Sequence, residues 1–578
     1  MKKLSFIDSA FLLAESRETP MHVGGVNLFT LPEDIDEQEF LHGQATEYRT
    51  TEELQPPFGD RLKMGRLGLA GPVYWQPDKS LDMDYHVRHS ALPKPGRYRE
   101  LFALASRLHS TLLDRNRPLW EMHLIEGLQN RQFAVYSKYH HAAIDGARSM
   151  HLTHSMFSTS DKTRVEGSPL SLASQERYRA RLAQHNPAAF SDAELRNVAD
   201  ALKESFDSGA HIFSSLKRLA NGWMGKGGAL ALPWLDVPRS SINTPVDGAR
   251  RFVAQSWPFA RVRGVRKALN GTFNDAVLAM CAGGLRLYLQ KHSELPAKSL
   301  KAMVPVSLRR EGDIDSSNAV GAISADLATN IEDPLKRFAA IQASMIAGKE
   351  LFKGMKPQEA ALMLQMLQLP GLLLMPLGLM SRFPPYSTVI SNVPGPRQPM
   401  YWNGARLDGI YPASIVTEGV ALNITLVTYD ENVDFGITAC RRTMPQVQRL
   451  IDYMELALQE LEEAAGLSKP KARKPASKTA VAKASAKKRV TPRAEVKAKA
   501  KTKTKTKTKT KTKTKTKTKA KAKAKAKAKV NSKVKAQPKA KTKAAVKAKA
   551  KPTAKAKPRL KAKPKGKAQP KSRSRAAK

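Results

Sequence analysis

The sequence predicts an α/β protein built from two layered domains, followed by a long disordered extension. Strand-like and helix-like stretches interleave in both halves of the chain. Their connections differ in length, which favours helices packed on sheets over a helix bundle or a barrel. Residues 1–465 exceed the roughly 250–300 residues that one hydrophobic core normally supports. Two domains of about 200 residues each are therefore expected.

The charge of the chain lies almost entirely at its C-terminal end. The 578 residues carry a formal net charge of +47, and residues 466–578 hold 46 of the 98 basic residues but only one acid, Glu495. Residues 1–465 are nearly neutral, with 52 basic and 50 acidic residues. The extension repeats Lys-Thr over 501–519 and Lys-Ala over 519–529. Such a segment repels itself and has little to bury, so we expect it to be disordered.

Two cysteines, Cys281 and Cys440, stand far apart and without metal-ligand spacing. This usage favours a reducing compartment and argues against disulfides and a zinc site. The N-terminal stretch LSFIDSAFLLAESRE is interrupted by Asp8 and Glu15 and lacks the apolar core of a signal peptide. We therefore expect a cytoplasmic protein with no metal ion.

In the first half, Ser5 and Asp8 resemble a helix start, and helical or alternating spacing marks most later elements. The expected helices cover 6–14 and 99–113, with a further helix from Asp145 toward Phe157, and the expected strands cover 21–29, 120–125 and 132–139. We expect loops over 58–95 and 160–186.

A capping box, Ser191-Asp192-Ala193-Glu194, opens a helix that we expect to link the halves, and residues 221–245 resemble an interdomain loop. The second half repeats the mixture of strands and helices. Its expected strands are 251–257, 301–306, 319–327, 387–391 and 421–429, and its expected helices are 260–269, one from 273 onward, 333–347 and 444–465.

The most apolar run of the chain, residues 359–380, contains Gln365, Gln368, Pro370 and Pro376. These residues interrupt the run of about 20 apolar residues that a membrane-spanning helix needs. Two interpretations stay open: a broken helix that packs on the core, or one that rests its apolar face on a bilayer.

Between a predicted strand and a predicted helix lies the stretch HHAAIDG, from His140 to Gly146. His141 or His140 can act as a base, Asp145 supplies an anionic partner, and Gly146 permits close backbone approach. Other roles are open as well: a structural His pair, or Asp145 as an ordinary helix N-cap. A metal site is disfavoured, because no third group of ligands has the spacing it needs.

HHxxxDG resembles the active-site motif of an acyltransferase superfamily. Its members include chloramphenicol acetyltransferase, peptide-synthetase condensation domains and the bacterial wax ester synthase/diacylglycerol acyltransferases. Further stretches, covering about residues 4 to 460, are similar to the last group and stand in its order: LSFIDSAFLL, PMHVGG, HVRHSALPKPG, PLWE, GTFNDAVLA, MVPVSLR and SNVPGP.

The resemblance implies two chloramphenicol-acetyltransferase-like domains with a channel between them. Acyl-CoA would enter from one side and diacylglycerol or a long-chain alcohol from the other, as substrates and without a cofactor. The expected boundaries are 1–187 for the domain with HHAAIDG, 188–245 for the connection, 246–465 for the second domain and 466–578 for the extension.

The resemblance also implies unequal roles within HHAAIDG. His141 would be the general base that takes the acceptor's hydroxyl proton, a contribution worth about 10²–10⁴-fold, and an unperturbed imidazole is already neutral near pH 7. His140 would orient the loop, Asp145 would hold it, and Gly146 would allow its tight path. No covalent acyl-enzyme is expected, because the chain has neither a nucleophile elbow nor a Cys beside a His.

Two further motifs are candidates for channel or structural roles. Pro118, Leu119 and Trp120 are expected to shape the core and the channel wall. Asn274 is a candidate for stabilising the oxyanion, but a helix N-cap is the favoured interpretation of this residue. Asp275 lies beside it, at or just inside the start of the expected helix.

The basic extension resembles the linker-histone-like C-terminal regions of some bacterial proteins. Salt-sensitive binding to DNA phosphates without base readout is one expectation. An anionic membrane or lipid inclusion is another, and a solvated tail without a partner is a third. For the whole protein, two alternatives to the leading function stay open: an acyltransferase with another alcohol acceptor, and a non-catalytic protein that tethers lipid inclusions to the nucleoid.

Overall fold

The structure is a computed structural model, and it describes most of residues 1–467. Within that range the description leaves out Leu67 and residues 145–151, 153–154, 186–216, 225, 308–319, 354–359, 361–362, 365, 368–369, 372–373 and 375–377. The predicted linking helix from Ser191, nearly all of the predicted helix after Asp145, and the predicted tail lie outside the described residues.

The first sheet has six strands in the order β12-β13-β2-β7-β6-β5. They are β12 (Tyr401–Trp402), β13 (Ala405–Ala413), β2 (His22–Thr30), β7 (Gln132–His140), β6 (Trp120–Glu126) and β5 (Val87–Ala91). All pairs are antiparallel except β5 with β6. The strands predicted at 21–29, 120–125 and 132–139 are confirmed.

The second sheet also has six strands, in the order β10-β9-β11-β14-β15-β8. They are β10 (Val320–Asp326), β9 (Lys301–Ser307), β11 (Thr388–Pro394), β14 (Leu422–Tyr429), β15 (Asn432–Cys440) and β8 (Arg250–Pro258). β11 runs parallel to β9 and β14, so this sheet is mixed as well. The five strands predicted here are confirmed in position, and β15 is one that the sequence pattern did not indicate.

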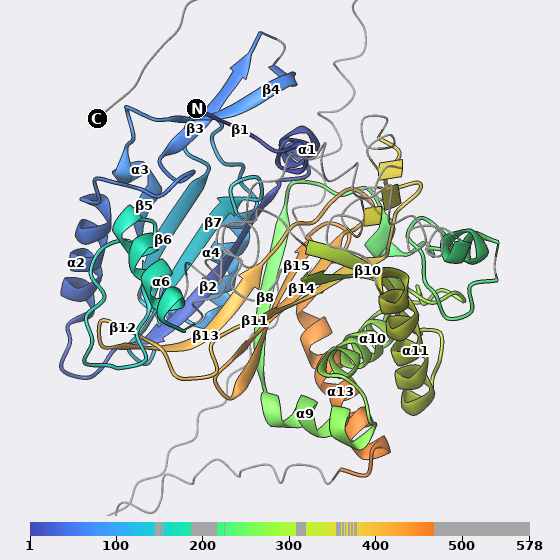
Figure 1. Ribbon diagram of the computed structural model, residues 1–578. Coiled ribbons are helices and arrows are strands. Elements are labelled where there is room, and N and C mark those ends of the chain that lie inside the picture. The colour runs from blue at the N-terminus through green and yellow to red at the C-terminus, as the bar shows by residue number, and fades with distance from the viewer. Residues whose placement is uncertain are drawn as a thin grey trace, which may run out of the picture. The chain divides into compact units, whose positions relative to one another are not determined.

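Four helices pack on the second sheet, and their buried side chains form the largest core cluster together with those of its strands (Figure 1). They are α9 (Phe259–Ala268), α10 (Phe273–Lys291), α11 (Pro334–Phe352) and α13 (Gln448–Ala464). All four match predicted helices. α10 is buried around most of its circumference, which explains its nearly continuous apolar sequence.

In the first half, α1 (Phe6–Ala14) and α4 (Tyr98–His109) are confirmed, and Ser5 caps α1 by accepting the Asp8 backbone N–H at 3.1 Å. Three more helices are present: α2 (Glu37–Arg49), α3 (Met83–His86) and α6 (Leu172–His185). A small separate sheet joins β1 (Lys2–Lys3), β4 (Gly68–Pro77) and β3 (Asp60–Gly65).

The two predicted loop regions are corrected by the structure. Residues 58–95 contain β3, β4, α3 and β5, and residues 160–186 contain α6. β3 is largely exposed, so its side chains need not alternate between apolar and polar. The α6 sequence, LASQERYRARLAQH, is rich in good helix formers but has few apolar residues to reveal a period.

Strand β13 lies in the first sheet although it comes from the second half of the chain. It pairs with β2 from Arg406 opposite Thr30 to Ala413 opposite Gly24. The boundaries drawn at 187, 245 and 465 remain a prediction, but sheet membership does not follow them.

Helix α4 joins the two sheets. Its Ser106 hydroxyl accepts the backbone N–H of Phe252 at 2.8 Å, and its Ser110 hydroxyl accepts that of Arg250 at 2.8 Å. Both N–H groups belong to β8, the edge strand of the second sheet. α4 therefore covers an edge that would otherwise present unpaired backbone groups.

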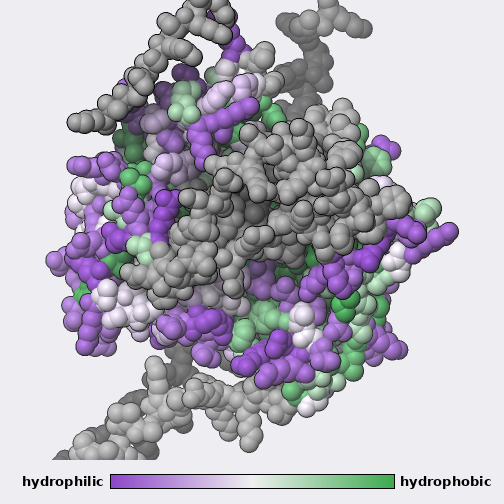
Figure 2. All heavy atoms as spheres, in the orientation of Figure 1, coloured by the Kyte–Doolittle hydropathy of each residue, from purple (hydrophilic) through white to green (hydrophobic). Residues whose placement is uncertain are grey.

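Hydrophilic side chains make up much of the coloured surface in Figure 2, and hydrophobic atoms reach it in separate patches. Among the described residues, none of the helices combines the length and apolar character needed to cross a membrane.

Candidate active site

Strand β7 ends at His140, the first residue of HHAAIDG. His140 stands opposite His22 of β2, and its backbone N–H donates to the Leu119 carbonyl at 2.9 Å. The chain then turns, with the Ala143 N–H donating to the His140 carbonyl at 2.9 Å. The two histidines are therefore held at the end of a fully paired central strand.

The ring of His140 is fully buried, and its contacts define its tautomer. The backbone N–H of Ala142 donates to Nδ1 at 3.1 Å. Because Nδ1 accepts, the ring proton of the neutral form lies on Nε2. Nε2 is 3.4 Å from a carboxylate oxygen of Glu15.

Glu15 follows directly on α1 and is only 2% exposed. Arg115 donates to it twice, from Nε at 3.0 Å and from Nη2 at 2.9 Å, and the Met21 N–H donates at 3.2 Å. Burial alone would raise the pKa of Glu15, but the contact with His140, the Met21 N–H and the charge of Arg115 outweigh it and lower that pKa. Glu15 therefore presents a fixed negative charge to His140.

His141 is held from a different side and is partly exposed. Its ring stacks on Phe11 of α1, with ring centroids 4.1 Å apart and planes 14° from parallel. Its backbone N–H donates to the Met21 carbonyl at 2.9 Å. Helix α1 and the residues after it thus position both histidines, one through Glu15 and the other through Phe11.

The motif Pro118-Leu119-Trp120 lies next to this turn. Leu119 accepts the His140 N–H and belongs to a cluster with Leu12 and Ala142. Trp120 is buried, donates from its indole to the Phe58 carbonyl at 2.8 Å and packs in the first-half core. These contacts support the packing role expected for the motif. Asp145 and Gly146 lie outside the described residues, so their expected roles stay predictions.

Asn274 and Asp275 are the second and third residues of helix α10, which packs on the second sheet. The helix cap is Thr272, and Asp275 completes a capping box by accepting the Thr272 N–H at 2.7 Å. The N-cap interpretation of Asn274 is therefore wrong. Its side-chain oxygen instead accepts a hydrogen bond at 2.8 Å from Asn392 of β11.

A second pair of buried histidines lies beside His140. His22 Nε2 bonds the His109 carbonyl at 2.9 Å, and the ring of His109 bridges the Tyr136 hydroxyl at 2.9 Å and the Ser414 carbonyl at 3.1 Å. Burial lowers the pKa of His109 to about 3 and that of His22 well below its usual value. Both rings are therefore neutral at physiological pH and act as hydrogen-bonding struts.

Four charged or titratable side chains from strands β5, β6 and β7 meet on the first sheet. Glu121 lies 3.3 Å from Lys138 and 3.6 Å from both Arg88 and His123. Burial opposes the charge of Glu121, but its contacts with His123, Lys138 and Arg88 bring its pKa to about 2. Lys138 also donates to the Leu108 carbonyl at 3.2 Å, at the C-terminal end of α4. This cluster secures α4 to the sheet.

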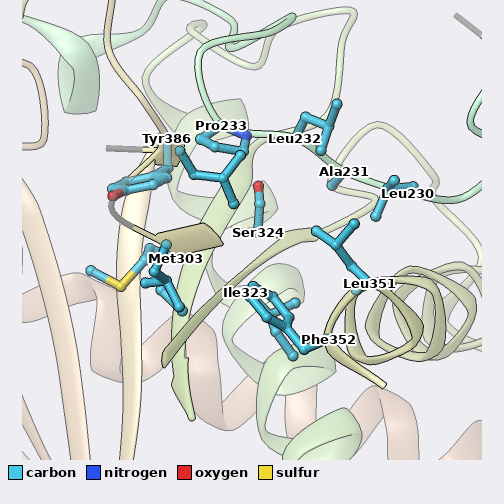
Figure 3. Close-up of a pocket in the computed structure, with 14 residues that line it drawn as sticks. Leu230, Ala231, Leu232, Pro233, Met303, Ile323, Ser324, Leu351, Phe352 and Tyr386 are labelled. Carbon is cyan, nitrogen blue, oxygen red and sulfur yellow. The ribbon is translucent and has the colours of Figure 1, made fainter. Parts of the chain in front are cut away.

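In the described part of the chain, no group of three or more His, Cys, Asp or Glu side chains is arranged to hold a metal ion. An apolar pocket lies between the 230–233 segment and strands β9 and β10 (Figure 3). Its volume of about 30 Å³ is far below the roughly 300–1,000 Å³ of small-molecule sites. It holds at most a water or two and is not a substrate site as it stands.

Sequence reasoning identified the two histidines but missed the residues that hold them. Glu15 entered only as a charge that interrupts a signal peptide, and Phe11 only as part of a helix. One signal was present in the sequence: Phe11 and Glu15 stand four residues apart, so they lie on the same side at the end of α1.

Comparisons with known proteins agree on one family. Residues 4–277 match the wax ester synthase/diacylglycerol acyltransferase catalytic domain, and residues 316–462 match the C-terminal domain of the same group. A probable diacylglycerol O-acyltransferase of Mycobacterium tuberculosis is 43% identical over 463 residues, which are 80% of this chain and 98% of that protein. The O-acyltransferase WSD of Acinetobacter baylyi is 38% identical, with 80% and 97% covered.

The fold agrees as well. A wax ester synthase/diacylglycerol acyltransferase from Marinobacter aquaeolei VT8 superposes with a TM-score of 0.63 at 38% identity, over 81% of this chain and 100% of that one.

Proposed function

The chain belongs to the wax ester synthase/diacylglycerol acyltransferase family, and we propose that it is an O-acyltransferase that moves a fatty acyl group from acyl-CoA to diacylglycerol or to a long-chain alcohol. One observation carries the chemistry. The partly exposed imidazole of His141 is held by Phe11 and by its own backbone, directly after a fully buried His140 that Glu15 orients.

In the proposed reaction His141 is the general base. A ring nitrogen of His141 takes the proton of the acceptor hydroxyl while the oxygen attacks the thioester carbonyl carbon. The tetrahedral intermediate collapses, the carbon–sulfur bond breaks, and the imidazolium returns its proton to the departing CoA thiolate. The products are an ester and CoA, and His141 is neutral again.

Direct transfer, without a covalent acyl-enzyme, is part of this proposal. Both cysteines are buried, and burial raises the pKa of Cys281 to about 12. A thiol that stays protonated at neutral pH is a poor nucleophile. The ternary complex of acyl-CoA, acceptor and His141 is therefore the expected route.

We further propose that the substrates reach His141 through a channel between two domains of the chloramphenicol-acetyltransferase type. Helix α4 and strand β13 support this arrangement, because each ties the first sheet to a segment of the second half. Asn274 remains our candidate for stabilising the oxyanion, since its side chain is not consumed by the helix cap. Because diacylglycerol and long-chain alcohols are insoluble in water, we also propose a cytoplasmic enzyme that associates with the inner membrane or with lipid inclusions.

The test measures CoA release with diacylglycerol, long-chain alcohols and short alcohols, and identifies the esters formed. His141→Ala is expected to lower kcat by about 10²–10⁴-fold, the usual worth of general-base catalysis. Equal CoA release by the wild type and His141→Ala would refute the mechanism. Ester formation on a different class of alcohol would instead favour the alternative acceptor, and no CoA release from any acceptor would favour the non-catalytic tether.

A further inference from the structure

A small satellite cluster of apolar side chains lies apart from the large cores. It is built from three distant stretches of the chain: Leu219 and Leu232, Leu351 at the end of α11, and Met363. The indole N–H of Trp234 donates to the Leu367 carbonyl at 2.8 Å and ties the first stretch to the third. These stretches therefore form one continuous piece of surface.

The outer side of this satellite cluster is also apolar. Trp223 is 61% exposed, Met224 is 60% exposed, and Met366 is 47% exposed. Single exposed apolar residues are ordinary on a protein surface. Here Trp223 and Met224 are adjacent, and Met366 lies on another stretch of the same cluster. Grouped apolar side chains of this kind are typical of an interaction surface.

Basic side chains surround these residues. Lys217, Arg218 and Lys226 are exposed, and no acidic residue occurs from Lys217 to Leu235. Among the described residues, the acid that pairs with one of these cations is Glu350 of α11, which lies 3.8 Å from Arg218 but also pairs with Lys353 at 2.9 Å. The charge at the rim is therefore positive.

We propose that the Trp223 patch, made of Trp223, Met224 and Met366 with Lys217, Arg218 and Lys226, docks on an anionic lipid bilayer. Tryptophan and methionine would enter the headgroup region, while the three cations would contact lipid phosphates. The combination of indole, thioether and cations without acids fits an anionic lipid surface better than it fits another protein. The proposal rests on the proposed function, because a water-insoluble acceptor must be drawn from such a surface.

The experiment must distinguish this patch from the basic extension, which carries most of the charge of the chain. The full-length protein is mixed with vesicles of equimolar phosphatidylcholine and phosphatidylglycerol whose acyl chains carry bromine, which quenches only indoles that enter the bilayer. We expect quenching in the wild type and its loss in Trp223→Phe, although Trp223→Phe still binds.

A second arm measures sedimentation with the same vesicles at high salt, where contacts of the extension are screened. The affinity of the double variant Trp223→Ser, Met224→Ser for the vesicles should be lower by about tenfold or more, because two apolar side chains that enter the bilayer are lost. Leu456→Ser, on α13 and 51% exposed, is the matched control and should bind like the wild type.

Quenching that persists in Trp223→Phe, or a double variant that sediments like the wild type, would overturn the proposal. A change of oligomeric mass in the double variant without vesicles would show a second copy on this surface and also overturn it. CoA release with a soluble short alcohol serves as the independent readout. It should be unchanged in the double variant. Absence of CoA release from the wild type with every acceptor, long or short, would count against the proposed function, not against the patch.

Discussion

Glu15 is the main support of HHAAIDG that lies outside the motif, because its carboxylate faces His140 Nε2 at 3.4 Å. A contiguous motif reveals His140 and His141, but Glu15 and its partner Arg115 lie 100 positions apart and meet only in the fold. No local spacing predicts a contact between residues so distant in sequence. The sequence therefore identified the proposed base and left its support to be found in three dimensions.

Replacing Glu15 tests this support. Glu15→Gln removes the carboxylate that His140 Nε2 faces, and we expect kcat for CoA release to fall by about tenfold to a hundredfold from lost positioning, with the KM for acyl-CoA little changed. Glu15→Asp should recover part of the rate.

Glu100→Gln is the matched control, since Glu100 pairs with exposed Arg97 on α4 away from the histidines. A Glu15→Gln enzyme with the kcat of the wild type would remove Glu15 from the mechanism.

Asp434 gives the fold a pH dependence of its own. It is buried, and its oxygens accept from the Ser256 hydroxyl at 2.6 Å and the Ile410 N–H at 2.8 Å. Burial raises its pKa to about 7 despite these two hydrogen bonds. The folded state thus keeps a proton that the unfolded state loses near its ordinary pKa of about 3.9. The free energy of unfolding should therefore fall as pH rises from about 4 to about 7.

Asp434→Asn removes this titration and preserves the size of the side chain. Its amide can accept from the Ile410 N–H and donate to the Ser256 hydroxyl, which in turn can donate to Tyr411. Denaturant unfolding from pH 5 to pH 8 measures this effect. The free energy of unfolding of the wild type should fall by on the order of 1–4 kcal/mol over that range, and the fall should be smaller in Asp434→Asn. Equal slopes would contradict the assignment.

At the scale of elements, apolar periodicity predicted what the cores required. The helices of the second sheet and strands such as β2, β7 and β14 were found because burial imposes a pattern on them. Strand β15 was missed although it is buried along nearly its whole length. Strand β3 and helix α6 were missed because few of their side chains are buried. Strand β13 was missed because its local sequence shows no clear strand pattern. The sequence also did not predict that the Ser106 and Ser110 hydroxyls bond the backbone of β8, because serine is mostly an exposed residue.

The joint between α4 and β8 can be measured. Ser106→Ala and Ser110→Ala each leave a backbone N–H of β8 without its acceptor, at Phe252 and Arg250 respectively. We expect each to lower the free energy of unfolding by about 1–3 kcal/mol, the cost of an unsatisfied buried donor. Ser80→Ala, on an exposed loop, should change it by less than about 0.5 kcal/mol. Denaturant unfolding decides the matter, and three equal midpoints would show that α4 does not secure this edge.

For the whole molecule, composition predicted the division between body and extension, and the family resemblance predicted two layered α/β halves. The described residues up to Leu467 fall in one compact unit. Composition could not predict that a strand from the second half of the chain joins the first sheet. That strand, β13, pairs with the edge of β2 and packs on both sheets.

The extension should be separable from catalysis. A chain ending at Ala476 keeps all the described contacts, so it should release CoA at the wild-type rate. The full-length protein should bind DNA non-specifically with a steep loss of affinity between low and moderate salt, as expected for lysines that displace counterions from phosphates. The shortened chain should lose that binding in a filter or gel assay. Unchanged retention would show that DNA binding, if present, belongs to the body.

Strand β13 also sets the order in which the protein can fold during synthesis. Between Thr30 at the end of β2 and Ala405 at the start of β13 the ribosome adds about 375 residues, which takes roughly 20–75 s at about 5–20 residues per second. Throughout that interval the nascent first sheet ends in an unpaired β2 edge, and such edges recruit strands from other chains. Translation speed and chaperone supply, more than the stability of the finished fold, should therefore govern how much enzyme a cell obtains.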